Sequence, residues 1–188
     1  MTEKQTIIID NGSDTCKVGY AEDIKPRSVF PSVVGHPKNP PDTKRVGDWA
    51  IDKKQFYFLK YPIDCGTITN WDDMEKIWEH GIYSELHADP SEHPVVLTDP
   101  VMNAKHQREM MIQIIFETFN VPSFYVAYQG VLSLFASGRS TGIAVDIGNS
   151  ISQFVPVYEG ISIQYASLKN NLGGRDIDTY LNKLLRDY

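Results

Sequence analysis

Two short stretches of the sequence repeat a pattern of residues that can bind phosphate and a divalent cation. DNGS at residues 10–13 and DIGN at residues 146–149 each place an aspartate two residues before a glycine. Glycine permits a tight turn whose backbone N–H groups bind an anion, and the aspartate can hold the water shell of a cation. A single such turn also fits an ordinary tight turn, whereas the pair is more informative. We expect the two turns to clamp a polyphosphate.

Two further side chains suit phosphate chemistry. Lys17 lies seven residues after Asp10 and can reach a phosphate as a point charge, although a solvated strand lysine also fits. Gln129 lies between the two stretches and carries an uncharged amide, which can orient a water against a terminal phosphate. The alternative for Gln129 is a surface or capping glutamine.

Strands and helices are interleaved around these residues, which favours an α/β layer architecture. Residues 6–10 and 15–20 are rich in β-branched side chains and flank the turn NGSD, so they predict a hairpin. Asn70 can cap a helix over residues 70–78. Further extended segments or strands are predicted at residues 27–35, 93–100, 123–128 and, as three strands, 140–168. Further helices are predicted at residues 103–119, 126–138 and 173–188.

Composition excludes several other functions. The net charge is −6 and no basic run is present, so nucleic acid is not expected as a direct ligand. Two cysteines without CxxC spacing predict reduced thiols rather than a disulfide framework or a zinc site. The N-terminus has a run of only three isoleucines, too short for a signal sequence or a membrane helix, so no membrane contact is expected.

Long segments of the chain resemble the N-terminal half of actin. They include DNGSDTCKVGYAEDIKPRSVFPSVVG, LKYPIDCGTITNWDDMEKIWEH, REMMIQIIFETFNVPSFYVAYQGVLSLFASGRSTGI and YEGISIQYASLKNNLGGRD. The resemblance implies the actin, sugar-kinase and chaperone ATPase fold, an α/β fold of mixed sheets flanked by helices. It also implies two domains facing across a cleft that holds ATP or ADP with Mg²⁺ or Ca²⁺. The first domain would span residues 1–136, with a small exposed subdomain around 31–60, and residues 137–188 would begin the second.

The resemblance assigns roles to residues one by one. Asp10 and Asp146 correspond to carboxylates that hold the water shell of the cation, and Gln129 to the residue that positions the attacking water. The residues expected to bind the nucleotide phosphates are Gly12, Ser13, Asp14, Thr15, Lys17, Gly148, Asn149 and Ser150. The residues expected in a hydrophobic groove for partner proteins and neighbouring actin-like subunits are Phe135, Ala136, Gly138, Ser140 and Ile161.

Several residues depart from the family pattern. Asp14 replaces a glycine, and an added carboxylate about 5 Å from a phosphate costs about 3 kcal/mol at a dielectric near 20, roughly a hundredfold in affinity, unless it points outward. Asn149 and Ser150 replace Asp-Gly in the second loop. Gln153 replaces a histidine thought to assist the attacking water, so hydrolysis should slow before binding weakens. The loop NPPDTKR at residues 39–45 is about half the family's usual length.

The sequence therefore predicts an actin-like, nucleotide-binding structural or cytoskeletal protein that is at most a slow ATPase. The alternative is a non-hydrolysing scaffold subunit of a stable axonemal or chromatin assembly; a sugar kinase is less consistent with the long actin-like segments. We expect a cytoplasmic, cytoskeletal location, with the cilium or axoneme and the nucleus as alternatives. Because only half of the family's sequence is represented, we expect these 188 residues to belong to a larger polypeptide or a tight assembly.

Overall fold

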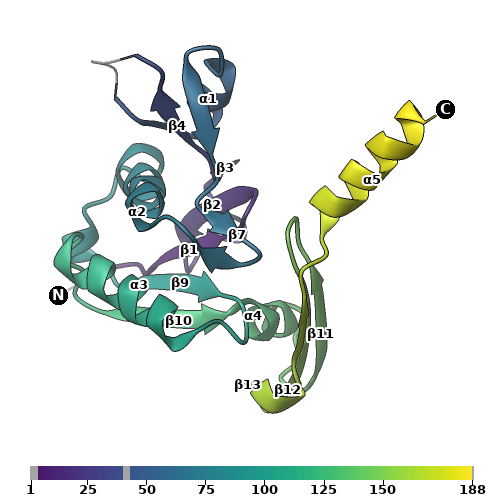
Figure 1. The fold of residues 1–188 in the computed structure, drawn as a ribbon. Coiled ribbons are helices and arrows are strands. Elements are labelled where there is room, and N and C mark those ends of the chain that lie inside the picture. The colour runs from purple at the N-terminus through teal and green to yellow at the C-terminus, as the bar shows by residue number, and fades with distance from the viewer. Residues whose placement is uncertain (1–3, 40–42, 188) are drawn as a thin grey trace. The chain divides into compact units, whose positions relative to one another are not determined.

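The computed structural model describes residues 4–39 and 43–187 (Figure 1). The chain forms two compact units. The first unit runs up to Thr98 and again from Ala104 to Val126, and the second comprises Asp99–Asn103 and the chain from Ala127 onward. The predicted domain boundary at residue 136 concerns the family's domains rather than contact-defined units, and it stays a prediction.

Within the described residues, no helix is both long enough and apolar enough to span a membrane.

A five-stranded sheet forms the centre of the first unit, in the order β10-β9-β1-β2-β3. β1 pairs antiparallel with β2, as the hairpin prediction requires, and parallel with β9. Parallel neighbours place their carboxyl ends at one edge of the sheet, where α/β proteins commonly bind ligands. The strands are β1 (Ile7–Asn11), β2 (Thr15–Tyr20), β3 (Ser28–Pro31), β9 (Val95–Asp99) and β10 (Phe124–Tyr128).

Helices α2 and α3 contribute buried side chains to the core of this unit. Helix α2 (Trp71–Glu79) begins as predicted, because the Asn70 side chain accepts a hydrogen bond from the Asp73 backbone N–H at 3.0 Å. Helix α3 (Lys105–Glu117) buries Met111, Ile114 and Ile115 at helical spacing and is slightly shorter than predicted. Two short helices lie in the same unit, a π-helical His80–Glu85 and a 3₁₀ Pro90–Glu92.

A small three-stranded sheet lies in the predicted subdomain region, in the order β5-β4-β6. Its elements are β4 (Val34–Pro37), β5 (Arg45–Val46), β6 (Tyr57–Lys60) and the short helix α1 (Asp48–Asp52). Strands β7 (Ile63–Asp64) and β8 (Thr67–Ile68) form a separate two-stranded sheet. Residues 40–42, in the middle of the predicted short loop over 39–45, lie outside the described residues.

A buried carboxylate connects this small sheet to α2. The Asp73 side chain is fully buried, and its oxygens accept hydrogen bonds from Lys44 Nζ and His36 Nε2, each at 2.7 Å. Burial alone would raise the pKa of Asp73, but the hydrogen bonds from Lys44 and His36 outweigh it and lower the pKa below the usual value. The charged form of Asp73 therefore stabilises the folded chain.

Replacing Asp73 by asparagine should lower the free energy of unfolding by about 1–3 kcal/mol at pH 7, because Lys44 and His36 lose their anionic partner and both are partly exposed. A lowered carboxyl pKa contributes stability above the unfolded value near 4, and that contribution disappears as pH falls through the folded pKa. The difference between the two proteins should therefore shrink below about pH 4. Urea unfolding at pH 7 and pH 3 measures both effects.

Asp72 provides the matched control, because it occupies the same first turn of α2 and is exposed. Asp72→Asn should change the unfolding free energy by less than about 0.5 kcal/mol at either pH. Equal losses in the two variants would show that the effect of Asp73 comes from charge near the helix N-terminus and not from its buried partners.

The second unit contains a four-stranded sheet in which β12 pairs with β11, β13 and β14. The sequence predicted three of these strands, and β14 is the addition. The strands are β11 (Gly142–Ile147), β12 (Ser152–Tyr158), β13 (Ile161–Ser162) and β14 (Leu168–Asn170), accompanied by α4 (Gln129–Ala136), a 3₁₀ turn at Gln164–Ala166 and α5 (Gly174–Arg186).

Helix α4 packs on one face of the β11–β12 hairpin, beside which Figure 1 draws it. Gly130 permits this approach, because a Cβ there would lie 3.0 Å from the Val155 side chain. Gly138 ends the helix as predicted: its φ is 75°, and the Arg139 N–H donates to the Leu134 carbonyl at 3.2 Å.

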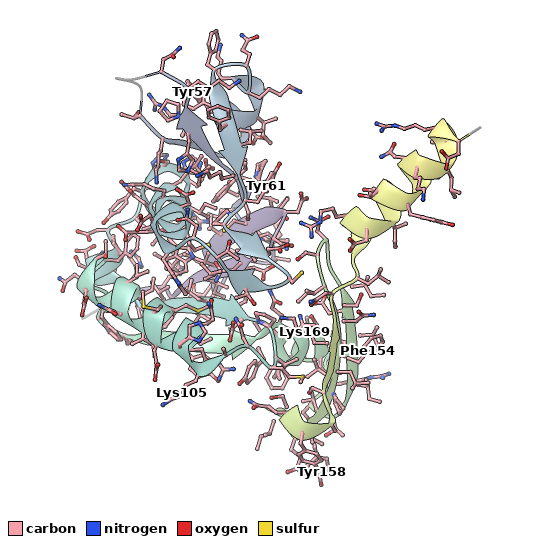
Figure 2. The ribbon with its side chains drawn as sticks, in the orientation of Figure 1. Tyr57, Tyr61, Lys105, Phe154, Tyr158 and Lys169 are labelled. Carbon is pink, nitrogen blue, oxygen red and sulfur yellow. The ribbon has the colours of Figure 1, made fainter. Side chains whose placement is uncertain are left out.

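The opposite face of this sheet is apolar and exposed. Ile143, Val145 and Ile147 alternate along β11, and Phe154 (labelled in Figure 2) and Leu168 lie on the neighbouring strands in register with Val145. Helix α5 likewise has no buried residue, and its predicted apolar stripe is exposed. The stripe consists of Ile177, Leu181, Leu184 and Leu185.

Candidate nucleotide-binding hairpins

The first candidate loop joins β1 to β2. Asp10 pairs with Lys17 across the two strands, so their side chains lie on the same face. A Cβ on Gly12 would lie 2.3 Å from the Thr15 carbonyl oxygen, a distance that no side chain could occupy. The tight turn that the sequence predicted at DNGS therefore requires glycine at this position.

Two neighbours hold the Asp10 carboxylate. Lys17 Nζ donates to Oδ2 at 2.7 Å, and the Thr98 hydroxyl donates to Oδ1 at 2.7 Å. The same hydroxyl oxygen accepts the Asn11 backbone N–H at 2.9 Å. Since the carboxylate remains partly exposed, it is a fixed anionic oxygen donor with an ammonium group beside it. Such a pair can hold the water shell of a hard cation and contact a phosphate.

Sequence reasoning missed the residues that fix this arrangement. Asn11 is buried: its Nδ2 donates to the Thr98 carbonyl at 3.1 Å, and its Oδ1 accepts from the Trp78 indole N–H at 2.9 Å. Thr98 lies at the carboxyl end of β9, next to β1 in a parallel pair. A polar residue ending a predicted apolar strand was the signal that could have identified it.

The remaining residues of this loop differ in exposure. Ser13 and Thr15 are half-buried, whereas Asp14 is exposed, and its backbone carbonyl accepts the Ser32 N–H at 2.7 Å.

Cys16 is buried beneath the loop, and burial raises the pKa of its thiol well above the usual range. Cys16 therefore packs as a neutral thiol and is not a nucleophile.

The second candidate loop, between β11 and β12, repeats the register of the first. Asp146 pairs with Gln153 across the strands, at the same sequence spacing as Asp10 and Lys17. The Gly148 N–H closes the turn by donating to the Ile151 carbonyl at 2.8 Å. Gly148 is exposed, Asn149 is half-buried and Ser150 is buried. The repeat seen in the sequence is thus also a repeat in hairpin geometry.

The N-terminus of α5 supports this second loop. The Gly174 N–H donates to the Gly148 carbonyl and the Arg175 N–H to the Asn149 carbonyl, both at 3.0 Å. Gly173 lies so close to the loop that a Cβ there would be 2.3 Å from the Asn149 carbonyl oxygen. The stretch GGRD, interpreted from sequence as a helix start, begins a helix as expected and also anchors the loop.

Gln129, the first residue of α4, lies next to Gln153 of β12. Gln153 is buried; its Oε1 accepts the Val101 backbone N–H at 2.9 Å, and its Nε2 donates to Gln129 Oε1 at 3.4 Å. The structure therefore brings Gln129 together with Gln153, one of the residues that depart from the family pattern. Val101 was not identified from the sequence, because a backbone donor leaves no signature in residue type.

The donor set of the two loops fits a cation and a polyphosphate. Asp10 and Asp146 supply carboxylate oxygens, which magnesium and calcium prefer, and Lys17 supplies a cationic donor. Gly12 provides a turn that a Cβ would fill. In the part of the chain that the structure describes, no group of three or more His, Cys, Asp or Glu side chains is arranged as a direct metal site. The two hairpins belong to different units, so the expected clamp stays a prediction.

Residues expected to line the partner groove gather in the second unit. The Gly160 N–H donates to the Ser140 carbonyl at 2.7 Å, and a Cβ on Gly160 would lie 2.9 Å from the Phe135 ring. Phe135 and Ile161 are both exposed, and nothing surrounds the Cβ position of Gly138 within 4 Å. These side chains provide an open apolar surface, whose use by partners stays a prediction.

The fold and the two loops define a mixed α/β protein with an Asp-x-Gly hairpin in each of two compact units. The family model described as Actin matches residues 1–188. The chain belongs to the actin family, and the resemblance and the actin-like α/β fold expected from sequence are confirmed.

Proposed function

We propose that this actin-family chain binds ATP or ADP with Mg²⁺ or Ca²⁺ and serves as a structural, cytoskeletal subunit that hydrolyses the nucleotide slowly. The observation that carries this proposal is the Asp10 carboxylate, held at the end of a glycine turn by Lys17 and Thr98. That arrangement gives a fixed anion for the cation's water shell and an ammonium for a phosphate.

Different residues of the chain bind the cation and the phosphates. Asp10 and Asp146 orient water molecules of the cation, which neutralises phosphate charge when it is bound. Backbone N–H groups of the two glycine turns, with Ser13 and Thr15, bind phosphate oxygens. Lys17 adds a cationic donor, and Gln129 positions a water.

A second candidate is a scaffold subunit of a stable assembly, such as an axonemal or chromatin complex, that holds nucleotide without hydrolysing it. The hydrogen bond from Gln153 to Gln129 favours the scaffold, because the side-chain oxygen of Gln129 already has a protein partner.

In either role we propose contacts with actin-like subunits or actin-binding proteins through the surface around Phe135 and Ile161. We also propose a cytoplasmic or cytoskeletal location.

The proposal is tested by purifying the protein from its native source, denaturing it, and identifying the released nucleotide by chromatography. We expect stoichiometric adenine nucleotide, and its ATP-to-ADP ratio separates the two candidates. Mostly ADP supports slow hydrolysis, whereas ATP retained over days supports the scaffold. A preparation without nucleotide would refute binding, and sedimentation with added ATP would then ask whether the chain still assembles.

A further inference from the structure

A hydrogen-bonded network connects the core of the first unit to the Asp10 carboxylate. The Trp78 indole N–H donates to Asn11 Oδ1 at 2.9 Å, and Asn11 Nδ2 donates to the Thr98 carbonyl at 3.1 Å. The Asn11 backbone N–H donates to the Thr98 hydroxyl at 2.9 Å, and that hydroxyl donates to Asp10 Oδ1 at 2.7 Å. Because Trp78, Asn11 and Thr98 are buried, water does not compete for these partners.

The chemistry of the donors fixes the direction of the bonds. An indole N–H can only donate, so Asn11 must turn its side-chain oxygen toward Trp78. The Asn11 NH₂ group then faces the Thr98 carbonyl, which can only accept. The Asn11 backbone N–H likewise can only donate, so the Thr98 hydroxyl oxygen accepts it and directs its hydrogen at Asp10. Asn11 therefore holds Thr98 at two atoms and is itself held by Trp78.

Trp78 is the immobile end of this network. It lies on α2, fully buried in the same core as Ile9 of β1 and Leu97 of β9, and a close-packed core holds a ring of this size in one position. The Asp10 carboxylate at the other end is partly exposed, and its partner Lys17 is 42 % exposed. The buried Thr98 hydroxyl is therefore the firmer of the two supports.

We propose that Trp78 and Asn11 are positioning residues for the Asp10 carboxylate and act on it through the Thr98 hydroxyl. The network orients Asp10 before a ligand arrives, so a cation's water shell meets a carboxylate that is already in place. Partners that orient a metal-binding group strengthen binding, because less conformational freedom is lost when the cation arrives. The effect on the cation rests on the proposed function, whereas the orientation of Asp10 does not.

Carboxyl-carbon NMR on the ligand-free 188-residue chain tests the orientation. Thr98→Val removes the hydroxyl at nearly constant volume and should displace the Asp10 carboxyl resonance. Trp78→Phe removes the indole N–H at the far end of the network and should displace that resonance in the same direction.

Trp71→Phe is the matched control, because it makes the same exchange on the same helix outside the network. It should leave the Asp10 resonance in place. An Asp10 resonance that stays in place in Trp78→Phe, or that moves equally in Trp71→Phe, would overturn the role of Trp78.

The reverse measurement needs no change at Trp78 and decides the question if Trp78→Phe does not fold. Thr98→Val should displace the indole N–H resonance of Trp78, because Asn11 loses its hydroxyl partner and shifts. Thr98→Ser keeps a hydroxyl and should leave that resonance near its original position. Equal displacement in the two Thr98 variants, or none in either, would show that the network does not extend to Trp78.

Titration calorimetry with ATP and Mg²⁺ measures the effect on binding. Thr98→Val should weaken binding about tenfold, the lower end of the range for residues that orient a metal-binding group, and Trp78→Phe about threefold. Thr98→Ser should restore most of the affinity, and the differences should shrink when Mg²⁺ is omitted. If Trp78 were purely structural, Trp78→Phe would lower only the unfolding temperature and leave the affinity measured well below it unchanged.

The two kinds of measurement separate this inference from the proposed function. If the unmodified chain bound no nucleotide, the proposed function would be refuted, and the Asp10 and Trp78 resonances would still decide the orientation. If the resonances moved while every variant bound ATP and Mg²⁺ normally, the network would orient Asp10 without serving the cation, and its role in binding would be refuted.

Discussion

Replacing Asp10 by asparagine should weaken the binding of ATP with Mg²⁺ about a hundredfold. Asparagine keeps the shape of the side chain and can still accept the Thr98 hydroxyl, but it removes the charge that Lys17 and a cation's water shell both use. Losing one member of a buried hydrogen-bonded charge pair typically costs about 2–5 kcal/mol. Because this pair is partly exposed, we take the lower part of that range, and about 2.7 kcal/mol corresponds to a hundredfold. Titration calorimetry with and without Mg²⁺ measures the effect, which should be smaller without the cation.

Asp14→Asn provides the matched control within the same loop. Asp14 is exposed, so water screens its charge, and we expect its removal to strengthen binding by less than about tenfold. Losses of the same size in both variants would indicate a general effect of loop charge. Unchanged binding in Asp10→Asn would exclude the first hairpin as the cation site.

The second large effect should come from Gly173→Ala. Its Cβ would lie 2.3 Å from the Asn149 carbonyl oxygen and 2.7 Å from the Ser150 nitrogen, and backbone atoms cannot move aside without moving the loop. We expect the unfolding free energy to fall by about 2–4 kcal/mol, since the start of α5 must separate from Gly148 and Asn149 and both hydrogen bonds are lost. Hydrogen exchange at the Gly174 and Arg175 amides should accelerate accordingly.

The neighbouring glycine provides a control of the same chemistry. A Cβ on Gly174 would have no atom closer than 3.9 Å, and the residue begins α5. Gly174→Ala should therefore be neutral or stabilise by up to about 1 kcal/mol, because alanine is the better helix former. If both alanine variants lost stability equally, helix-start flexibility and not contact with the loop would be the cause.

Local patterns in the sequence predicted the elements well. The hairpin around Gly12, the cap at Asn70 and the stop at Gly138 each depend on residues within a few positions, and the structure confirms all three. The actin-like fold was predicted from long matching segments rather than from these local rules.

The supports of the candidate site were not predictable in this way. Thr98 reaches Asp10 from a strand 88 residues away, and Val101 reaches Gln153 across 52 residues, so both contacts exist only once the sheets have formed. Gly173 resembles any helix-start glycine until the neighbouring backbone of Asn149 is known. Sequence identified the residues that suit phosphate chemistry, whereas tertiary packing determines which of them are held in place.

The exposed apolar face of β11 has a practical consequence for handling this protein. Ile143, Val145 and Ile147 form a continuous exposed apolar surface, and β11 pairs with another strand on only one side in the described sheet. An exposed apolar strand at a sheet edge is a template for unwanted self-association. We therefore expect this surface to lower the solubility of the protein at high concentration. Dilute samples with mild detergent are the sensible starting conditions for crystallisation or spectroscopy.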